Sequence, residues 1–233
     1  MHFQFDTIGV VHSPFKQKFA IPRQPGLSNA KASIEMLAPY NDPQALLGIE
    51  QFSHLWLSFI FHQNISKGWS PLVRPPRLGG NQKIGVFATR SSFRPNPVGL
   101  SVVRFERLRQ SDEQLFIDIE GVDLLDQTPI IDIKPYIPYA DSLSDATGGF
   151  AHDSPSPLLS VIFSAEAQSQ LDRFEQRYPD LRKLIDQVLS QDPRPAYKKD
   201  KIDNKVYAVS LYDFDIRWQV DNSTCQVLEI LKL

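Results

Sequence analysis

The chain has 233 residues, of which 42% are hydrophobic and 22% are charged, and its formal net charge is −2. This size allows a sizeable buried core arranged as one large domain or two small ones. The longest apolar run, residues 55–61, is interrupted by Ser58 and falls far short of the roughly 20 residues of a membrane-spanning helix. The slightly acidic balance, taken alone, argues against a nucleic-acid partner, because phosphate contacts need cations.

Several function classes are disfavoured by what the sequence lacks. Residues 1–6 contain neither a basic region nor an apolar segment of signal-peptide length, and Cys225 is the only cysteine, so no internal disulfide can form. The five histidines show no short ligand spacing, which argues against a metal site. The Gly-x-Ser-x-Gly elbow and the glycine patterns of dinucleotide and phosphate loops are also missing. We expect a cytoplasmic protein without a membrane segment.

The positive charges gather in two places. Between residues 69 and 109 eight lysines and arginines accompany a single acid, Glu106. A second cluster follows much later and consists of Arg194, Lys198, Lys199 and Lys201. Such clusters are either solvated loop and strand faces or contact surfaces for a polyanion, and composition does not decide between them.

The first 150 residues read mostly as short strands separated by proline and glycine. An extended segment is expected over residues 3–11, and Asp42 is expected to cap a helical turn that begins at Pro43. Further strands are expected at residues 54–62, 83–89, 100–108, 114–122 and 130–133. Short, closely spaced strands favour a barrel or strongly curved sheet over a parallel sheet with crossover helices.

The character of the chain changes at residues 142–157, which are rich in Ser, Asp, Gly and Pro and are typical of a linker. A helix is expected over residues 165–178, with an interruption at Pro179 and the same periodicity resuming over residues 181–188. Residues 214–220 alternate between apolar and polar, and a turn then leads to a last strand at 227–231. The predicted fold class is mainly β, with a small α+β domain at the carboxyl end.

Residues 90–101 form the first candidate site. Pro95 and Pro97 fix backbone angles, so this loop loses little entropy on binding and holds the guanidinium groups of Arg90 and Arg94 in place. Arginine suits bidentate capture of a carboxylate or a phosphate. Two interpretations remain open: a rigid ligand-binding loop, and a stiff hairpin connection whose arginines pair with acids elsewhere.

Residues 126–136 form the second candidate site. Asp132, Lys134 and Tyr136 are spaced by two, so they share one face of an extended segment. An acid, a cation and a phenol in a row are either a surface ion pair beside an aromatic ring or a set that handles protons and orients a ligand. The residues alone leave these two interpretations equal.

At these segments the sequence resembles the TsaA-like family, and nearly its whole length resembles the TrmO (YaeB) tRNA methyltransferases. The matching motifs occur in the same order and cover residues 8–15, 24–26, 52–56, 90–101, 132–136 and 192–197. The resemblance implies a single-sheeted β-barrel domain, residues 1–145, that binds S-adenosylmethionine, and a small α+β domain, residues 155–233, that contacts tRNA. It also implies a homodimer that methylates the exocyclic nitrogen of threonylcarbamoyladenosine beside the anticodon.

The resemblance also implies roles for individual residues. Cofactor contacts are expected from Gln24, Pro25, Gly26, His62, Gln63, Arg90, Leu100, Asp126, Gln127, Thr128 and Pro129. Arg90 suits the methionine carboxylate of the cofactor, and Asp126 suits a ribose hydroxyl or the amino group. Asp132 and Tyr136 are the expected groups that remove or orient the acceptor proton, and Lys134 is expected to stabilise negative charge.

Contacts with the anticodon arm of tRNA are expected from Arg94, Asn96, Arg194 and Tyr197. The alternative for residues 194–197 is a strut between the two domains. Two other function classes remain open for the whole protein: a non-catalytic barrel that binds RNA or a small effector, and a hydrolase that acts on a nucleotide-like ligand.

The sequence departs from the family pattern at Gln127, where we expect the family usually to have glycine. If this position requires a positive φ, Gln127 would be strained by about 1–3 kcal/mol. The neighbouring cofactor contacts would then be less secure.

Overall fold

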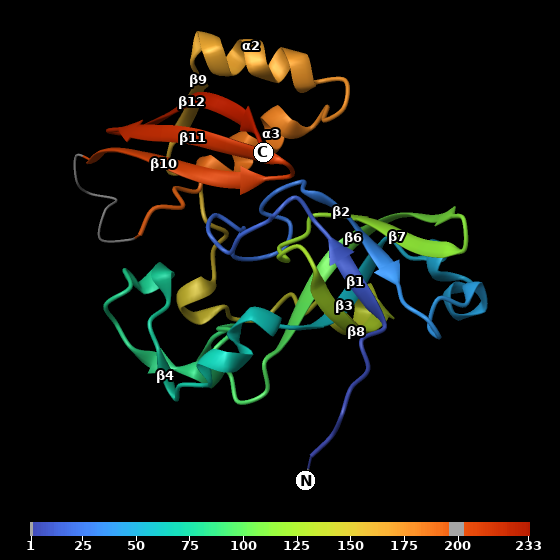
Figure 1. The fold of residues 1–233 in the computed structure, drawn as a ribbon. Helices are drawn as coiled ribbons and strands as arrows, with labels where there is room; N and C mark the ends of the chain where they lie inside the picture. Colours follow the sequence, from blue (N-terminus) through green and yellow to red (C-terminus); the bar gives the residue numbers. More distant parts are fainter. Residues whose placement is uncertain (1, 196–202) are drawn as a thin grey trace.

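A computed structural model describes residues 2–195 and 203–233 of the chain. The amino-terminal part is built on six strands that close into one antiparallel ring (Figure 1), in the order β1-β2-β7-β6-β3-β8. Their bounds are β1 Gly9–His12, β2 Lys31–Met36, β3 His54–Ile60, β6 Val98–Ser111, β7 Gln114–Glu120 and β8 Thr128–Pro135. Every neighbouring pair in the ring is antiparallel. The predicted mainly β character is confirmed.

The alternation of side chains explains why these segments form strands. In β3, Leu55, Leu57 and Phe59 are buried, whereas the residues between them are half-buried on the outer face. Strand β7 follows the same rule, with Ile117 and Ile119 inside. A period of two is typical of strands with one face on the core, so the apolar faces of the six strands fill the ring.

Between β3 and β6 the chain leaves the ring in an excursion, residues 61–97. It contains the 3-10 helices η3 (His62–Lys67), η4 (Pro76–Leu78) and η5 (Val86–Ala88) and a two-residue pair, β4 (Leu72–Val73) with β5 (Ile84–Gly85). The strand predicted at residues 83–89 is therefore wrong beyond Gly85. The Val86 carbonyl accepts both the backbone N–H and the hydroxyl of Thr89, at 3.1 and 2.8 Å, which closes a turn.

Short turns complete this part of the chain: η1 (Pro43–Leu46), η2 (Ile49–Gln51), α1 (Pro138–Asp141) and η6 (Gly149–Ala151). The predicted cap is confirmed, because the Asp42 carboxylate accepts the Gln44 N–H at 2.9 Å with Pro43 in the first turn. Of the extended segment predicted at residues 3–11, only Gly9 onward pairs in the sheet. Residues 142–157, the expected linker, are all exposed and contain only η6.

The carboxyl-terminal part is a smaller mixed unit. Its four-stranded sheet has the order β10-β11-β12-β9, with strands β9 (Ser160–Phe163), β10 (Asp203–Leu211), β11 (Phe214–Asp221) and β12 (Thr224–Lys232). The helices are α2 (Ala165–Phe174) and α3 (Leu181–Leu189), so the predicted helix ends four residues earlier than expected. The Ser164 hydroxyl caps α2 by accepting the Ala167 N–H at 3.0 Å. Strands β9 and β10 were not predicted.

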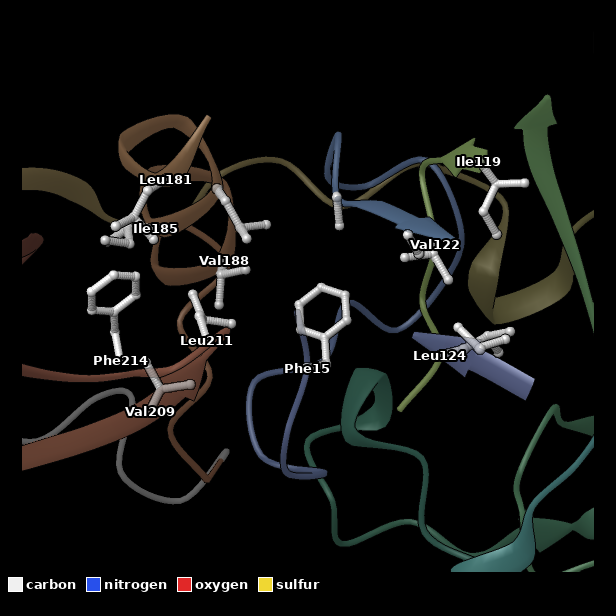
Figure 2. Packing of buried hydrophobic residues seen from close by; sticks show 14 of the residues in the cluster. Phe15, Ile119, Val122, Leu124, Leu181, Ile185, Val188, Val209, Leu211 and Phe214 are labelled. Atoms are coloured by element: carbon white, nitrogen blue, oxygen red, sulfur yellow. The ribbon is translucent and has the colours of Figure 1, made fainter. Parts of the chain in front are cut away.

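One aromatic ring joins the two parts. Phe15 is only 1% exposed, and Figure 2 shows its ring between Val188 and Leu211 on one side and Val122 and Leu124 on the other. The backbone supports the contact, because Phe15 forms a bridge with Leu211 and the Tyr212 N–H donates to the Pro14 carbonyl at 2.8 Å. The two parts therefore share one continuous apolar cluster. Within the described residues, no helix has both the length and the apolarity needed to traverse a bilayer.

Gln127 adopts a φ of 62°, so the turn before β8 does require the left-handed region. Replacing Gln127 with glycine should raise the free energy of unfolding by up to about 1 kcal/mol, because glycine relieves the strain but costs chain entropy. The matched control is Gln226→Gly on β12, an exposed strand position, where glycine should lower stability. Urea denaturation checks both, and a loss of stability in Gln127→Gly would contradict the strain argument.

Candidate active site

A cavity of about 430 Å³ opens beside the end of the ring where β3 leaves it and β6 enters it. Four segments of the chain line it: residues 18–24, residues 56–64, residues 89–100 and residues 123–128. The volume lies within the roughly 300–1,000 Å³ of small-molecule sites. The first candidate segment, residues 90–101, therefore lines this cavity, and Thr128 of the second candidate segment also reaches it.

Side-chain hydrogen bonds tie the cavity loops to one another. Lys18 donates to the side-chain oxygen of Asn64, and the Asn64 amide donates in turn to the Ser92 hydroxyl. Asn64 at the centre of this chain of bonds is buried, whereas Lys18 at its end is exposed. On the other side, Arg90 donates to the Gln24 side chain at 2.5 Å. Three loops that are distant in sequence thus hold one another, which pre-organises the cavity.

The apolar floor of the cavity, formed by the Phe59 ring, depends on the glycine at position 99. Gly99 of β6 lies directly opposite Phe59 of β3, and a Cβ at position 99 would lie 2.2 Å from the nearest atom of the Phe59 ring. Phe59 lines the cavity and packs edge-on against Phe61, with ring centroids 5.0 Å apart. Only glycine at position 99 leaves room for this ring, and the neighbouring Leu100 then faces the cavity.

A carboxyl group that the sequence analysis missed also lines this cavity. Asp123 follows β7, and its Oδ1 accepts the hydroxyl proton of the buried Ser101 at 2.6 Å. Burial raises the pKa of Asp123 to about 6, against the opposing effects of the Ser101 bond and the positive charge of Arg90. Among the described residues that line the cavity, Asp123 is the one carboxylate, beside the cations Lys18, Arg23, Arg90 and Arg94. Perturbed acids in clefts are typical of functional sites.

Asp123→Asn should stabilise the protein at alkaline pH. The folded-state pKa of about 6 lies above that of an unfolded aspartate, so the buried charge costs stability above pH 6 and nothing below about pH 4. The variant should gain up to about 3 kcal/mol at pH 8 and little at pH 4. Urea denaturation at both pH values tests this, with the exposed Asp112→Asn as control. An equal effect at both pH values would contradict the assignment.

A histidine at the cavity has a lowered pKa. Burial of the imidazole and the nearby Lys18 ammonium lower the pKa of His62, against a backbone hydrogen bond at Ile60 that raises it. These effects favour the neutral form of His62, which does not repel a cationic ligand.

Comparison with known protein families shows to which family the chain belongs. The family described as the tRNA-methyltransferase O N-terminal domain matches residues 10–142, and the TrmO C-terminal domain matches residues 156–233. The chain belongs to the TrmO family.

Bacterial relatives match nearly the whole chain, and a human relative matches a shorter stretch of it. The tRNA (adenine(37)-N6)-methyltransferase of Escherichia coli is 49% identical, and the alignment covers 98% of this chain and 97% of the relative. The human protein of the same name is 41% identical over 140 residues, which are 59% of this chain and 31% of its own. A crystal structure of TrmO from Pseudomonas aeruginosa superposes with a TM-score of 0.81 at 38% identity, covering 99% of each chain.

The cavity gathers part of the cofactor set that the TrmO resemblance implies. The predicted residues that line it are Gln24, His62, Gln63, Arg90, Leu100 and Thr128. The predicted residues that do not line it are Pro25, Gly26, Asp126, Gln127 and Pro129. Asp126 instead accepts the Ser13 N–H at 2.9 Å and pairs with Lys16 at 2.7 Å, so its carboxylate anchors the segment after β1.

The predicted catalytic set lies on the outer face of the ring. In the sheet register, Ser58 of β3 stands between Leu100 of β6 and Asp132 of β8, so Asp132 is two strand spacings, about 10 Å, from Leu100. Asp132 forms an ion pair with Lys134, and both border a second cavity of about 700 Å³ beside residues 39–52. Lys134 and Tyr136 both neighbour Trp56, which lines the first cavity: Lys134 is its register partner on β8, and the Tyr136 ring centroid lies 6.0 Å from that of Trp56.

The predicted tRNA contacts separate into two groups. Arg94 lines the cavity and donates to the Thr89 carbonyl at 2.7 Å, and Asn96 is exposed two residues further on. Arg194 is 2% exposed and binds both carboxylate oxygens of Asp192, at 2.8 and 2.9 Å. Burial and pairing are what the strut interpretation expects, and a contact between Arg194 and tRNA stays a prediction. Tyr197 lies outside the described residues.

Sequence reasoning missed Asp123 together with the Lys18 and Asn64 bonds. Asp123 is an isolated acid in the otherwise apolar run of residues 122–125, and such a placement at the end of a strand indicates a buried carboxyl. Asn64 gave no comparable signal, because its neighbours in sequence are polar or exposed.

Proposed function

We infer that this protein is an S-adenosylmethionine-dependent methyltransferase that acts on the N6 atom of adenosine 37 of tRNA. The observation that carries the inference is the 49% identity to the Escherichia coli tRNA (adenine(37)-N6)-methyltransferase over 98% of this chain. The cofactor assignment has its own support, because a Pseudomonas aeruginosa relative, 47% identical over 94% of the chain, has the words S-adenosylmethionine-dependent methyltransferase in its name.

The donor set of the first cavity fits S-adenosylmethionine. Arg90 offers a guanidinium to the methionine carboxylate, Asp123 offers a carboxylate to an ammonium or hydroxyl group, and Phe59 and Leu100 offer an apolar surface to the adenine. When bound, the cofactor supplies an electrophilic methyl group on a sulfonium centre. The cavity residues hold it in one orientation and exclude water from the line of transfer.

The acceptor that we propose is the exocyclic nitrogen of threonylcarbamoyladenosine. This nitrogen is conjugated to a purine and to a carbamoyl group, so its lone pair is a poor nucleophile until its proton is shared or removed. Tyr136 is our first candidate for that role, because its phenol can share a proton and its ring packs beside Trp56, which lines the cavity. Asp132 and Lys134 orient the acceptor from the outer face, and Arg94 receives the threonyl carboxylate.

We further propose the organisation that the family resemblance implies. Residues 1–145 form a single-sheeted barrel domain that binds the cofactor, and residues 155–233 form a small α+β domain. The ring closure of six strands and the limits of the two family matches support this division. A cytoplasmic homodimer is part of the same proposal. Exposed apolar side chains beside the second cavity, Leu47 and Phe52, support a subunit contact there.

Methylation of defined tRNA tests the proposed function. The purified protein is incubated with S-adenosylmethionine and tRNA that carries threonylcarbamoyladenosine, and the nucleosides are separated and weighed by mass spectrometry. We expect one added methyl group on that nucleoside and none on tRNA that lacks the threonylcarbamoyl group. Binding of both ligands by a folded sample without product would instead favour the non-catalytic RNA-binding barrel.

A further inference from the structure

The excursion between β3 and β6 lies in a long stretch of sequence without acids. From residue 51 to residue 105 the chain contains seven lysines and arginines and no Asp or Glu, although the whole protein has 27 acids and 25 basic residues. The side chains of Lys67, Arg74, Arg77 and Lys83 are exposed. A surface of this composition on an acidic protein complements a polyanion.

Three large aromatic side chains of the excursion face solvent. Trp69 is 55% exposed, Phe87 is 77% exposed and Phe93 is 38% exposed. None of the three lines the cavity, so the cofactor site does not account for them. Exposed aromatic rings among cations are the composition that proteins use to stack unpaired bases and bind their phosphates.

Backbone hydrogen bonds hold the segments that carry these three aromatic residues, here called the platform, next to one another. The Ser70 N–H, next to Trp69, donates to the Phe93 carbonyl at 3.3 Å. The Val86 N–H, next to Phe87, donates to the Pro71 carbonyl at 3.0 Å. All three aromatic residues are thus anchored around residues 69–71. Figure 1 shows the segment around β4 projecting away from the ring of strands.

The platform is continuous with the mouth of the cavity. Arg94 lines the cavity, and its guanidinium also lies 6.0 Å from the centroid of the Phe87 ring. The Arg94 bond to the Thr89 carbonyl fixes this position. A nucleotide whose base enters the cavity would therefore have its neighbours beside Phe87 and the rest of the platform.

We propose that Trp69, Phe87 and Phe93 stack on unpaired bases that flank the target nucleotide, while the exposed cations around them bind the phosphates of the same loop. The partner is single-stranded RNA in a loop, because duplex RNA buries its base faces and is bound through phosphates and 2′-hydroxyls. This inference rests on the proposed tRNA substrate, and it adds the surface on which the anticodon loop lies.

The test compares Trp69→Ala and Phe87→Ala with the matched control Tyr139→Ala, an exposed aromatic at 90% on α1, outside the excursion. Affinity for tRNA carrying the modification is measured by fluorescence anisotropy, and affinity for S-adenosylmethionine by calorimetry. Each platform variant should bind tRNA about 5- to 100-fold more weakly, with cofactor affinity unchanged. The control should bind tRNA as the wild type does, and Trp69→Phe should retain most of the affinity.

The outcomes separate this inference from the proposed function. Wild-type methylation together with unchanged tRNA affinity in both platform variants would overturn the platform and leave the function intact. Loss of dimer in sedimentation, with tRNA affinity unchanged, would also overturn it and assign the surface to subunit contact. Absence of methylation by the wild type, with the platform variants still weakened in tRNA binding, would overturn the function alone.

Discussion

Replacing Phe15 with alanine should lower the free energy of unfolding by about 3–5 kcal/mol. The ring is 1% exposed and contacts apolar side chains of both parts of the chain, so its removal leaves a cavity that neither part fills alone. Urea denaturation followed by tryptophan fluorescence measures the loss. Trp218 reports the carboxyl-terminal core, because it is fully buried in β11.

Phe3→Ala is the control for Phe15→Ala, since Phe3 is 75% exposed and its removal should change stability by less than about 0.5 kcal/mol. A loss below about 1 kcal/mol in Phe15→Ala would show that the ring is not packed between the two parts. Separate unfolding transitions in the wild type would contradict the shared core in a different way, because one continuous cluster should unfold cooperatively.

Gly99→Ala should damage the cofactor site through the Phe59 ring. The new Cβ would lie 2.2 Å from that ring, so the ring must leave its place on the floor of the cavity. Overpacking of this kind costs about 1–3 kcal/mol of stability. The affinity for S-adenosylmethionine, measured by calorimetry, should fall by roughly tenfold or more, because about 1.4 kcal/mol of lost contact corresponds to that factor.

Two further variants make the Gly99 prediction specific. Gly85→Ala is the matched glycine control, because its Cβ would meet nothing within 4 Å. It should leave both stability and cofactor affinity close to those of the wild type. In the double variant, Phe59→Leu should restore part of the stability lost in Gly99→Ala, because the smaller side chain accommodates the methyl group. Equal cofactor affinity in Gly99→Ala and Gly85→Ala would contradict the proposed cavity floor.

Most strands of the amino-terminal ring could be predicted because they depend on local alternation, but β2 was missed although its side chains alternate in the same way. Strands β3 and β7 bury every second side chain, and the sequence shows that period directly. The turn at Val86 could not be predicted in this way. Residues 83–89 have apolar side chains suited to a strand, and only the Thr89 and Pro71 partners show that the backbone turns there.

The missed strands of the carboxyl-terminal part have a different cause. Strand β9 is four residues long and pairs in parallel with β12, whose residues are more than 60 positions away. Short parallel pairing of this kind leaves no hairpin turn in the sequence, so no local signal marks it. The pairing of β10 with β11 shifts register between Asp203 and Tyr207, so regular alternation is confined to the last five residues of β10 and gives only a short local signal.

The lining of the first cavity could be anticipated where stiff backbone marks the sequence. Arg90, Leu100 and Thr128 line the cavity, and the prolines between Arg90 and Leu100 are visible in the sequence. Arg194 lies between two prolines, a pattern that suggests an exposed contact, so its burial could not be predicted from the sequence. Its partner, Asp192, lies only two residues away, but burial of the pair is a property of the tertiary packing.

The central claim is that the cofactor binds in the first cavity. It is tested most directly by measuring, by calorimetry, the affinity for S-adenosylmethionine of two variants, one at each cavity. Arg90→Ala removes a cation from the first cavity, and Lys134→Ala removes one from the second. If the cofactor binds in the first cavity, Arg90→Ala should lose roughly tenfold or more in affinity for S-adenosylmethionine, as expected for the loss of a charge-assisted hydrogen bond. Lys134→Ala should bind the cofactor as the wild type does. Wild-type affinity in Arg90→Ala with a loss in Lys134→Ala would contradict this placement of the cofactor.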